Sequence, residues 1–206
     1  MSYYFTDALE SLTSVARVQQ QQVFERWMEL DTQLTELRRD RERPSSFRLD
    51  AHLDVILRCI EDEQSGFISD QGDIRKGGAL WLQISLSKQW LFSTYELFRT
   101  TVEKSTCLEG TTGTQFCQPK SKKCPRCNVL RVKQELSSFR IPLAKHEPAG
   151  CNDYKDSNFH SQMMFEKDGG SVGWKNQGYP SKINDKVVTS RRELSDFVLD
   201  ALTANL

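Results

Sequence analysis

The sequence has no excess of charge of either sign and no long apolar run. Its 206 residues include 28 Lys and Arg and 28 Asp and Glu, so no overall field draws the chain toward nucleic acid or anionic lipid. No uninterrupted apolar segment reaches the roughly 20 residues of a membrane-spanning helix. The first residues, MSYYFTDALESL, lack the basic start and apolar centre of a secretory signal. We therefore expect a cytoplasmic protein with no membrane partner, in which the six cysteines are thiols or metal ligands rather than disulfides.

Motifs for nucleotide binding and for nucleophilic catalysis are also missing. The segment at 67–78, FISDQGDIRKGG, contains three glycines but lacks the GK[ST] ending of a phosphate-binding loop and has no strand before it. We therefore expect no nucleotide cofactor. The three histidines, His52, His146 and His160, belong to no readable Ser-His-Asp set, and a lone histidine is more often structural than catalytic.

What the sequence does contain is a long helical pattern over residues 78–104, GALWLQISLSKQWLFSTYELFRTTVEK. Apolar residues recur there at three- and four-residue spacing along two lines, one starting at Leu80 and Ile84 and the other at Leu82 and Leu86. A surface helix has a single apolar stripe, so two stripes predict burial on most sides. We expect this segment to be the central helix of a helical core.

A single long helix is predicted for residues 6–43, ended by Pro44. Apolar residues fall at every seventh position, namely Leu9, Ala16, Val23, Leu30 and Leu37. This is the repeat of a coiled coil, although Gln19, Arg26 and Gln33 interrupt its second seam. Two interpretations are open: the helix lies against the central helix, or it pairs with a second copy to form a homodimer.

Two shorter helices complete a core of four principal helices over residues 1–148. One is predicted at 50–64, with its apolar face formed by Leu53, Ile56, Leu57 and Ile60. The other is predicted at 129–139, where Pro142 in the following apolar stretch indicates a kink or a stop and restart. The fold class is therefore mainly α.

The composition changes after Pro148, and residues 149–206 are predicted to form a small α+β appendage. Apolar segments flank Asp168-Gly169-Gly170, a favourable turn for a β-hairpin, and a third short strand is expected at 186–189. Ser190-Arg191-Arg192-Glu193 forms a capping box ahead of a last amphipathic helix. So short a segment buries little surface alone, and we expect it to dock on the helical core.

The loop at 105–127 carries the strongest local signal for a metal. Cys124 and Cys127 have the CxxC spacing by which two thiolates hold one tetrahedral zinc ion. Cys107 and Cys117 could complete a four-cysteine site, although nine residues separate them where a second CxxC is typical. Two interpretations are open: a structural zinc ion held by these four cysteines, or free thiols in a surface loop.

Basic side chains crowd the same part of the chain. They are Lys120, Lys122, Lys123, Arg126, Arg131 and Lys133. Basic residues beside a zinc knuckle can follow a nucleic-acid backbone, but Phe116 alone is available nearby for base stacking. A nucleic-acid-binding surface and a solvated basic loop are therefore both open.

Arg140 and His146 are separated by five residues. This spacing resembles the Arg-x₄₋₆-His motif of HEPN ribonucleases. The resemblance implies that both side chains act on the scissile phosphate and the 2′-hydroxyl, without a metal ion. The chemistry suits these residues, because an arginine holds phosphate charge and a histidine titrates near neutral pH. The resemblance covers these two residues, and Pro142 between them departs from a smooth helix.

Glu96 and Arg99 lie three residues apart on the predicted central helix and can form an ion pair. They are candidates for a polar pocket, or for the one solvent-exposed polar strip of that helix. The function that we expect is that of a non-enzymatic helical interaction or regulatory protein, which self-associates or binds another helical protein. The alternatives are a metal-independent HEPN-like ribonuclease and a zinc-knuckle nucleic-acid-binding protein.

Overall fold

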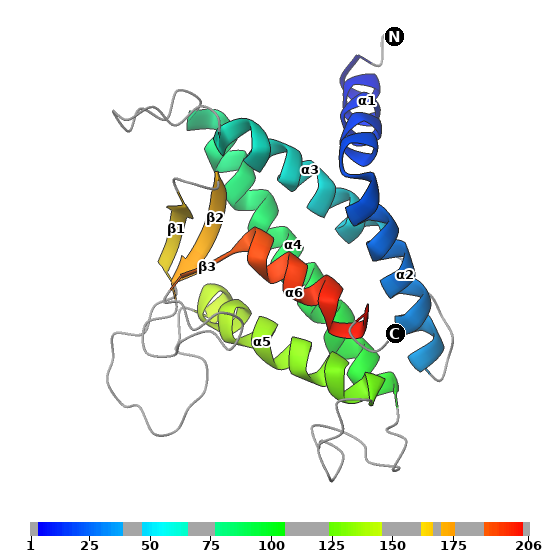
Figure 1. Ribbon diagram of the computed structural model, residues 1–206. Helices are drawn as coiled ribbons and strands as arrows, with labels where there is room; N and C mark the ends of the chain where they lie inside the picture. Colours follow the sequence, from blue (N-terminus) through cyan, green and yellow to red (C-terminus); the bar gives the residue numbers. More distant parts are fainter. Residues whose placement is uncertain are drawn as a thin grey trace.

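The computed structural model describes residues 4–38, 47–65, 77–105, 124–145, 162–166, 170–175 and 188–203. Within these ranges the protein consists of helices packed around a central helix, with a small antiparallel sheet at one end (Figure 1). The elements are α1 Tyr4–Gln19, α2 Gln21–Leu37, α3 Phe47–Ser65, α4 Gly77–Lys104, α5 Pro125–Lys145, β1 Gln162–Glu166, β2 Ser171–Lys175, β3 Val188–Ser190 and α6 Arg191–Thr203. The predicted mainly α fold is confirmed.

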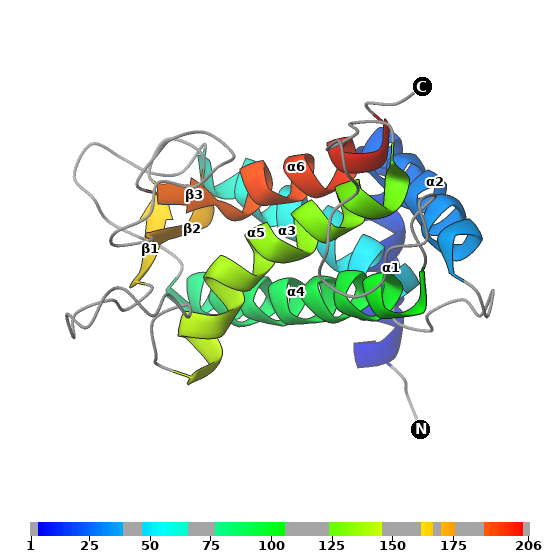
Figure 2. The same cartoon turned by 90° about the horizontal axis from the view of Figure 1, so that it is seen from below.

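Helix α4 runs through the middle of the molecule, with α3 along one side and α5 along the other (Figures 1 and 2). From Trp90 onward its apolar residues are buried except for the partly exposed Phe92, and Trp90, Leu91 and Phe98 are inaccessible to solvent. Its second turn differs, because Trp81 is 70% exposed and Leu82 is 55% exposed. The expected central helix is therefore confirmed, but its burial on most sides begins later than the two apolar lines predict.

The single helix predicted for residues 6–43 is wrong in one respect, because two helices occupy this stretch. Helices α1 and α2 meet end to end at Gln20, and an angle between them is visible in Figure 1. Gln20 has φ −112° and ψ 36°, which lies outside the α-helical region. The seven-residue repeat is divided accordingly: Leu30 of α2 is buried in the core, whereas Leu9 of α1 is exposed.

Helix α5 is longer than predicted at both ends. Pro125 is its first residue, a position where the missing N–H of proline costs no hydrogen bond. The carbonyl of Cys124 accepts the first bond of the helix from the N–H of Asn128, at 3.1 Å. The helix continues through Pro142 to Lys145, so the stop and restart expected at this proline does not occur.

The three strands form one antiparallel sheet in the order β1-β2-β3. Met164 is opposite Gly173 in the hairpin, and Gly173 is opposite Ser190 across the second pair. Gly170, just before β2, has φ 61°, a left-handed conformation that glycine adopts without steric cost. Its carbonyl accepts a hydrogen bond from Nε2 of Gln83 at 2.8 Å, which attaches the hairpin to α4.

Helix α6 begins with the predicted capping box. The N–H of Ser190 donates to Oε2 of Glu193 at 2.9 Å, and the N–H of Glu193 donates to the hydroxyl of Ser190 at 3.1 Å. These two bonds satisfy backbone donors that the start of a helix otherwise leaves unpaired. The helix then packs against α2 and α5.

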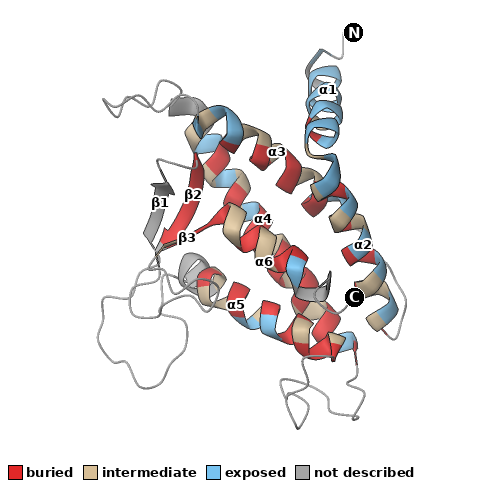
Figure 3. Ribbon diagram, viewed as in Figure 1, coloured by how far each residue is buried: buried red, intermediate tan, exposed pale blue. Residues whose placement is uncertain are grey.

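One apolar core runs through the described parts of the chain (Figure 3). Trp27 of α2, Trp90 of α4 and Trp174 of β2 are all fully buried in it. Leu194 and Val198 of α6 belong to the same core, so the last segment of the chain contributes directly to it. None of the helices described is both long and apolar enough to cross a membrane.

Candidate functional site

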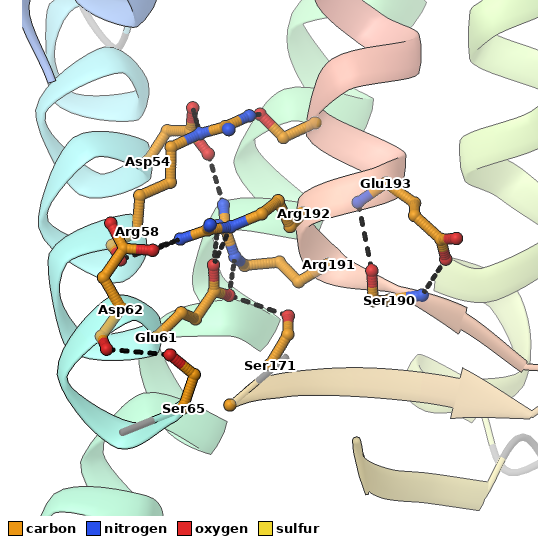
Figure 4. Close-up of polar contacts among 12 residues, drawn as sticks. Asp54, Arg58, Glu61, Asp62, Ser65, Ser171, Ser190, Arg191, Arg192 and Glu193 are labelled. Atoms are coloured by element: carbon orange, nitrogen blue, oxygen red, sulfur yellow. Dashed lines mark hydrogen bonds and ion pairs between the residues drawn. The ribbon is translucent and has the colours of Figure 1, made fainter. Parts of the chain in front are cut away.

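Five ionic side chains join α3 to the start of α6 (Figure 4). We refer to Asp54, Arg58, Glu61, Arg191 and Arg192 as the α3–α6 clamp. Nε and Nη2 of Arg191 each donate a hydrogen bond of 2.6 Å to the two oxygens of Glu61, and Nη1 donates to Asp54. The side chains of these three central residues are fully buried. Arg191 is thus held by two carboxylates, one of them in the strong bidentate geometry.

Arg58 extends the clamp along α3 and across to α6. Its Nε donates to Asp54 at 3.1 Å, and its Nη2 donates to the hydroxyl of Ser195 at 3.0 Å and to Asp196 at 2.6 Å. The indole N–H of Trp27 donates to the same Asp54 carboxylate at 2.8 Å. A carboxylate from α3 therefore collects donors from α2, α3 and α6.

Arg192 closes the clamp on its outer side. It donates to Glu61 at 3.1 Å, to Asp62 at 2.6 Å and to the backbone carbonyl of Arg58 at 2.9 Å. The hydroxyl of Ser171, at the start of β2, also donates to Glu61 at 2.8 Å. The clamp therefore connects α3 with both the sheet and the last helix.

The clamp stays ionised at neutral pH. Burial alone would raise the pKa of Asp54 and of Glu61. The charge of Arg191, combined with Arg58 at Asp54, with Arg192 at Glu61 and with the hydrogen bonds that both carboxylates accept, outweighs burial and lowers the pKa of both carboxyls. Burial alone would lower the pKa of Arg191, but the two carboxylates raise it. Groups so paired have no proton to exchange near pH 7, so this cluster holds elements together rather than performing acid–base chemistry.

Sequence reasoning missed the clamp because it considered only the apolar face of α3. Leu57 of that face is fully buried, but the charged line Asp54, Arg58 and Glu61 also points inward. These three residues are spaced four and three apart, which places them on one side of a helix. That spacing was a readable signal, and the partner Arg191 was read only as part of a capping box.

Glu96 and Arg99 do form an ion pair, on the surface of α4. Nε of Arg99 lies 2.6 Å from Glu96 and its Nη1 lies 2.6 Å from Glu103. Arg140 of α5 approaches Glu96 at 3.5 Å and lies over the ring of Tyr95, with 4.8 Å from its Cζ to the ring centroid. The side chains of Glu96 and Arg99 are 44% and 36% exposed, so the group is a surface strip where α4 and α5 meet.

The ribonuclease hypothesis stays a prediction. Of its two residues, Arg140 is placed against α4, and its charge is partly balanced by Glu96. His146 lies outside the residues that the structure describes. The distance between the two side chains, on which the hypothesis depends, is therefore not defined.

The zinc hypothesis also stays a prediction. Cys124 and Cys127 are both buried at the start of α5, and Cys107 and Cys117 lie outside the described residues. Within the described ranges, no three His, Cys, Asp or Glu side chains are placed so that they could hold a metal ion.

The basic residues near this loop fall into separate environments. Arg126 is buried, and its Nε donates to the carbonyl of Ser105 at 3.3 Å. Arg131 is exposed and Lys133 is partly exposed on α5. The three lysines of the set, Lys120, Lys122 and Lys123, lie outside the described residues, so a phosphate-binding surface stays a prediction.

Helix α1 projects from the body of the molecule, and its first three turns are exposed almost all round (Figure 3). Its exposed apolar face consists of Tyr4, Leu9, Leu12, Val15 and Val18. Leu12 is 46% exposed, Val15 53% and Val18 75%. Leu9, Leu12, Val15 and Val18 follow one another at three-residue spacing, so this strip winds around half of the helix. Several exposed apolar side chains on one helix mark an interaction site more often than a single exposed leucine does.

One edge of α1, next to Leu9 and Leu12, packs against α3. Thr13 and Gln20 are partly exposed and Ala16 is buried, and these residues share one side of the helix. Nε2 of Gln20 donates to Asp62 of α3 at 2.9 Å. The root of α1 is therefore fixed to α3, while the apolar face beyond it stays in solvent.

No protein-family model matches the chain, and neither the curated proteins nor the solved structures include a significant match to it. The function is therefore inferred from the side chains and their surroundings.

Proposed function

We propose that the protein is a non-enzymatic interaction protein that self-associates through the exposed apolar face of α1. The observation that carries the proposal is this face itself, five large apolar side chains in solvent on a helix that projects from the body. Fully burying one side chain of this kind contributes about 1.5–3 kcal/mol. Covering the face is therefore a substantial driving force for association.

A second copy of the chain is the partner that this face suits best. Leu9, Leu12 and Ala16 follow the three- and four-residue spacing of a coiled-coil seam, and two identical seams can interdigitate. A two-fold axis would bring the same patch of both chains together, which is the commonest arrangement of homodimers. The matching residues of α2, such as Leu30 and Leu34, are already buried in the chain's own core, so α1 supplies the free half of the repeat.

The state of the α3–α6 clamp supports a non-enzymatic role. Asp54, Glu61 and Arg191 are satisfied by one another, and their carboxyls are ionised at neutral pH. Such a cluster fixes the positions of elements and leaves no group ready to attack a substrate or transfer a proton.

The proposal is tested by measuring the mass of the protein by sedimentation equilibrium from 1 to 100 μM. We expect the wild type to be a dimer within this range. Leu12→Asp places a charge in the middle of the apolar face and should weaken association at least about tenfold, because burying an unpaired carboxylate is costly.

The matched control is Ser14→Asp, which adds the same charge to an exposed residue on the side of α1 opposite the seam of Leu9, Leu12 and Ala16 and should leave the association unchanged. A wild-type mass of one chain at 100 μM, or equal weakening by both variants, contradicts the proposal.

A further inference from the structure

The angle between α1 and α2 has no cause in the local sequence. Helices bend sharply at proline, at Gly/Ser pairs, at π-bulges or where a group inserts into the hydrogen-bond ladder. Residues 19–22 are four glutamines, which favour helix. Hydrogen bonds of helical spacing exist on both sides of the junction, from the N–H of Gln20 to Ala16 at 2.9 Å and from the N–H of Phe24 to Gln20 at 3.0 Å.

Contacts with the rest of the molecule hold the bend. Gln20 donates to Asp62 of α3, and Ala16 is buried at the same side of α1. A bend that tertiary contacts impose on a helix-favouring sequence can be released by removing those contacts, because the local preference is for a straight helix.

We propose that Gln20 is a hinge between this bent arrangement and one continuous helix over residues 4–37, and that self-association selects the straight form. This proposal rests on the self-association proposed above and describes how the hinge would regulate it. A change in the backbone dihedral angles of this one residue is enough, as in other hinges.

The straight form offers a second copy more apolar surface than the bent form. When α1 leaves α3, Ala16 is uncovered and joins Leu9 and Leu12 in a single seam that leads toward Val23. The bent form keeps Ala16 under α3 and interrupts the seam at Gln20. A partner that binds the straight form more tightly shifts the hinge toward it, and anything that stabilises the bend opposes association.

Two substitutions at the junction separate the forms. Gln20→Ala removes the bond to Asp62 and introduces the strongest helix former, so it should tighten self-association about fivefold or more. Gln21→Pro places proline at the first position of α2, where it suits a helix start but not the interior of a continuous helix. It should weaken self-association at least about tenfold. Gln22→Ala, an exposed neighbour, is the matched control and should change nothing.

The hinge itself is observed independently of mass by a distance measurement within one chain. Amino acids bearing a ketone replace Ser14 on α1 and Glu63 on α3, both of them exposed, and carry spin labels. Pulsed electron paramagnetic resonance should show a longer distance in Gln20→Ala than in Gln21→Pro. In the wild type, the fraction of molecules with the longer distance should increase as the protein concentration rises.

The outcomes distinguish this inference from the function on which it rests. Dimers whose label distance is the same in all variants and at all concentrations overturn the hinge and leave self-association standing. A chain that stays monomeric in both the wild type and Gln20→Ala overturns self-association, and with it the coupling, whatever the labels show. Tighter association and a longer distance in Gln20→Ala, with the reverse in Gln21→Pro, support the proposal.

Discussion

Asp50 is a carboxylic acid in the interior of the protein, in the first turn of α3 and 1% exposed. Burial raises its pKa to about 7, and a hydrogen bond with Ser93 of α4 opposes the rise only in part. Its Oδ2 has no hydrogen-bond partner among the described residues. Asp50 is therefore the reverse of Asp54, four residues along the same helix, which is buried with two arginines and has a lowered pKa.

The raised pKa makes the free energy of unfolding depend on pH near neutrality. Because the pKa is about 7 in the folded protein and 3.8 without burial, the folded form keeps a proton that the unfolded form has lost. Stability should therefore fall as the pH rises from about 4 to about 7 and level off above.

Asp50→Asn removes this penalty while keeping the shape of the side chain. At ~1.4 kcal/mol per pKa unit, we expect the advantage of the variant in urea unfolding to grow by about 2–3 kcal/mol between pH 5 and pH 8. Parallel stability curves for the two proteins over this range would show that burial does not penalise the ionised form of Asp50.

At the scale of elements, the turn at Gly170 fixes the β1–β2 hairpin against the end of α3. Gly170 lies so close to the end of α3 that an added Cβ would be 2.7 Å from the backbone N of Ser65 and would collide with the carbonyl of Glu61. Its positive φ adds a second reason for glycine. A Cβ added to Gly173, three residues further on, would lie 2.9 Å from a methyl group of Val188, which can move.

We expect Gly170→Ala to lower the free energy of unfolding by more than about 2 kcal/mol, because it combines backbone strain with a clash against fixed backbone. Gly173→Ala is the comparison within the same strand region and should cost less, since a side chain can yield where a backbone cannot. Urea unfolding of both variants decides the order, and an equal or reversed order would show that the turn is not tightly seated.

The helices and the capping box could be predicted from the sequence because their signals are local. Apolar spacing located α4, and Ser190 with Glu193 located the start of α6. The break at Gln20 could not be predicted from the sequence, since four glutamines favour an unbroken helix and the partner of Gln20, Asp62, lies 42 residues along the chain. Local patterns report what a segment prefers and do not report which partner overrides the preference.

The clamp shows the same limit at the candidate site. Asp54 and Glu61 mark one side of α3, but their partner Arg191 is 137 and 130 residues away. A single sequence does not show which of its arginines lies opposite a given carboxylate. The exposed face of α1 was partly readable, because the repeat beginning at Leu9 predicted a surface for pairing without showing that α2 uses its own half.

At the scale of the whole molecule, the clamp connects the first third of the chain to its last helix. Removing Arg191 would leave the buried Asp54 with Arg58 alone and the buried Glu61 with Arg192 alone, and would remove the bidentate pair at the centre of the clamp. Arg191→Met should therefore lower the free energy of unfolding by about 3–5 kcal/mol. Arg99→Met removes an arginine that also binds two carboxylates, but on the surface, and should cost less than about 1 kcal/mol.

Equilibrium unfolding in urea at pH 7 compares the two variants, with circular dichroism confirming that each retains its helices. We also expect a single transition in the wild type, because α6 and α4 share one core. A loss of under 1 kcal/mol in Arg191→Met, or separate transitions for α6 and the other helices, would mean that the clamp does not unite the molecule.

The clamp also cannot form until the ribosome has synthesised the start of α6. Glu61 leaves the ribosome 130 residues before the arginine that neutralises it, and at about 5–20 residues per second this interval lasts on the order of ten seconds. Throughout it, Glu61 and the part of α3 that binds the start of α6 lack their native partners. We expect a nascent chain to depend on chaperones until its last helix emerges, and a chain stopped before residue 191 to be sensitive to proteases.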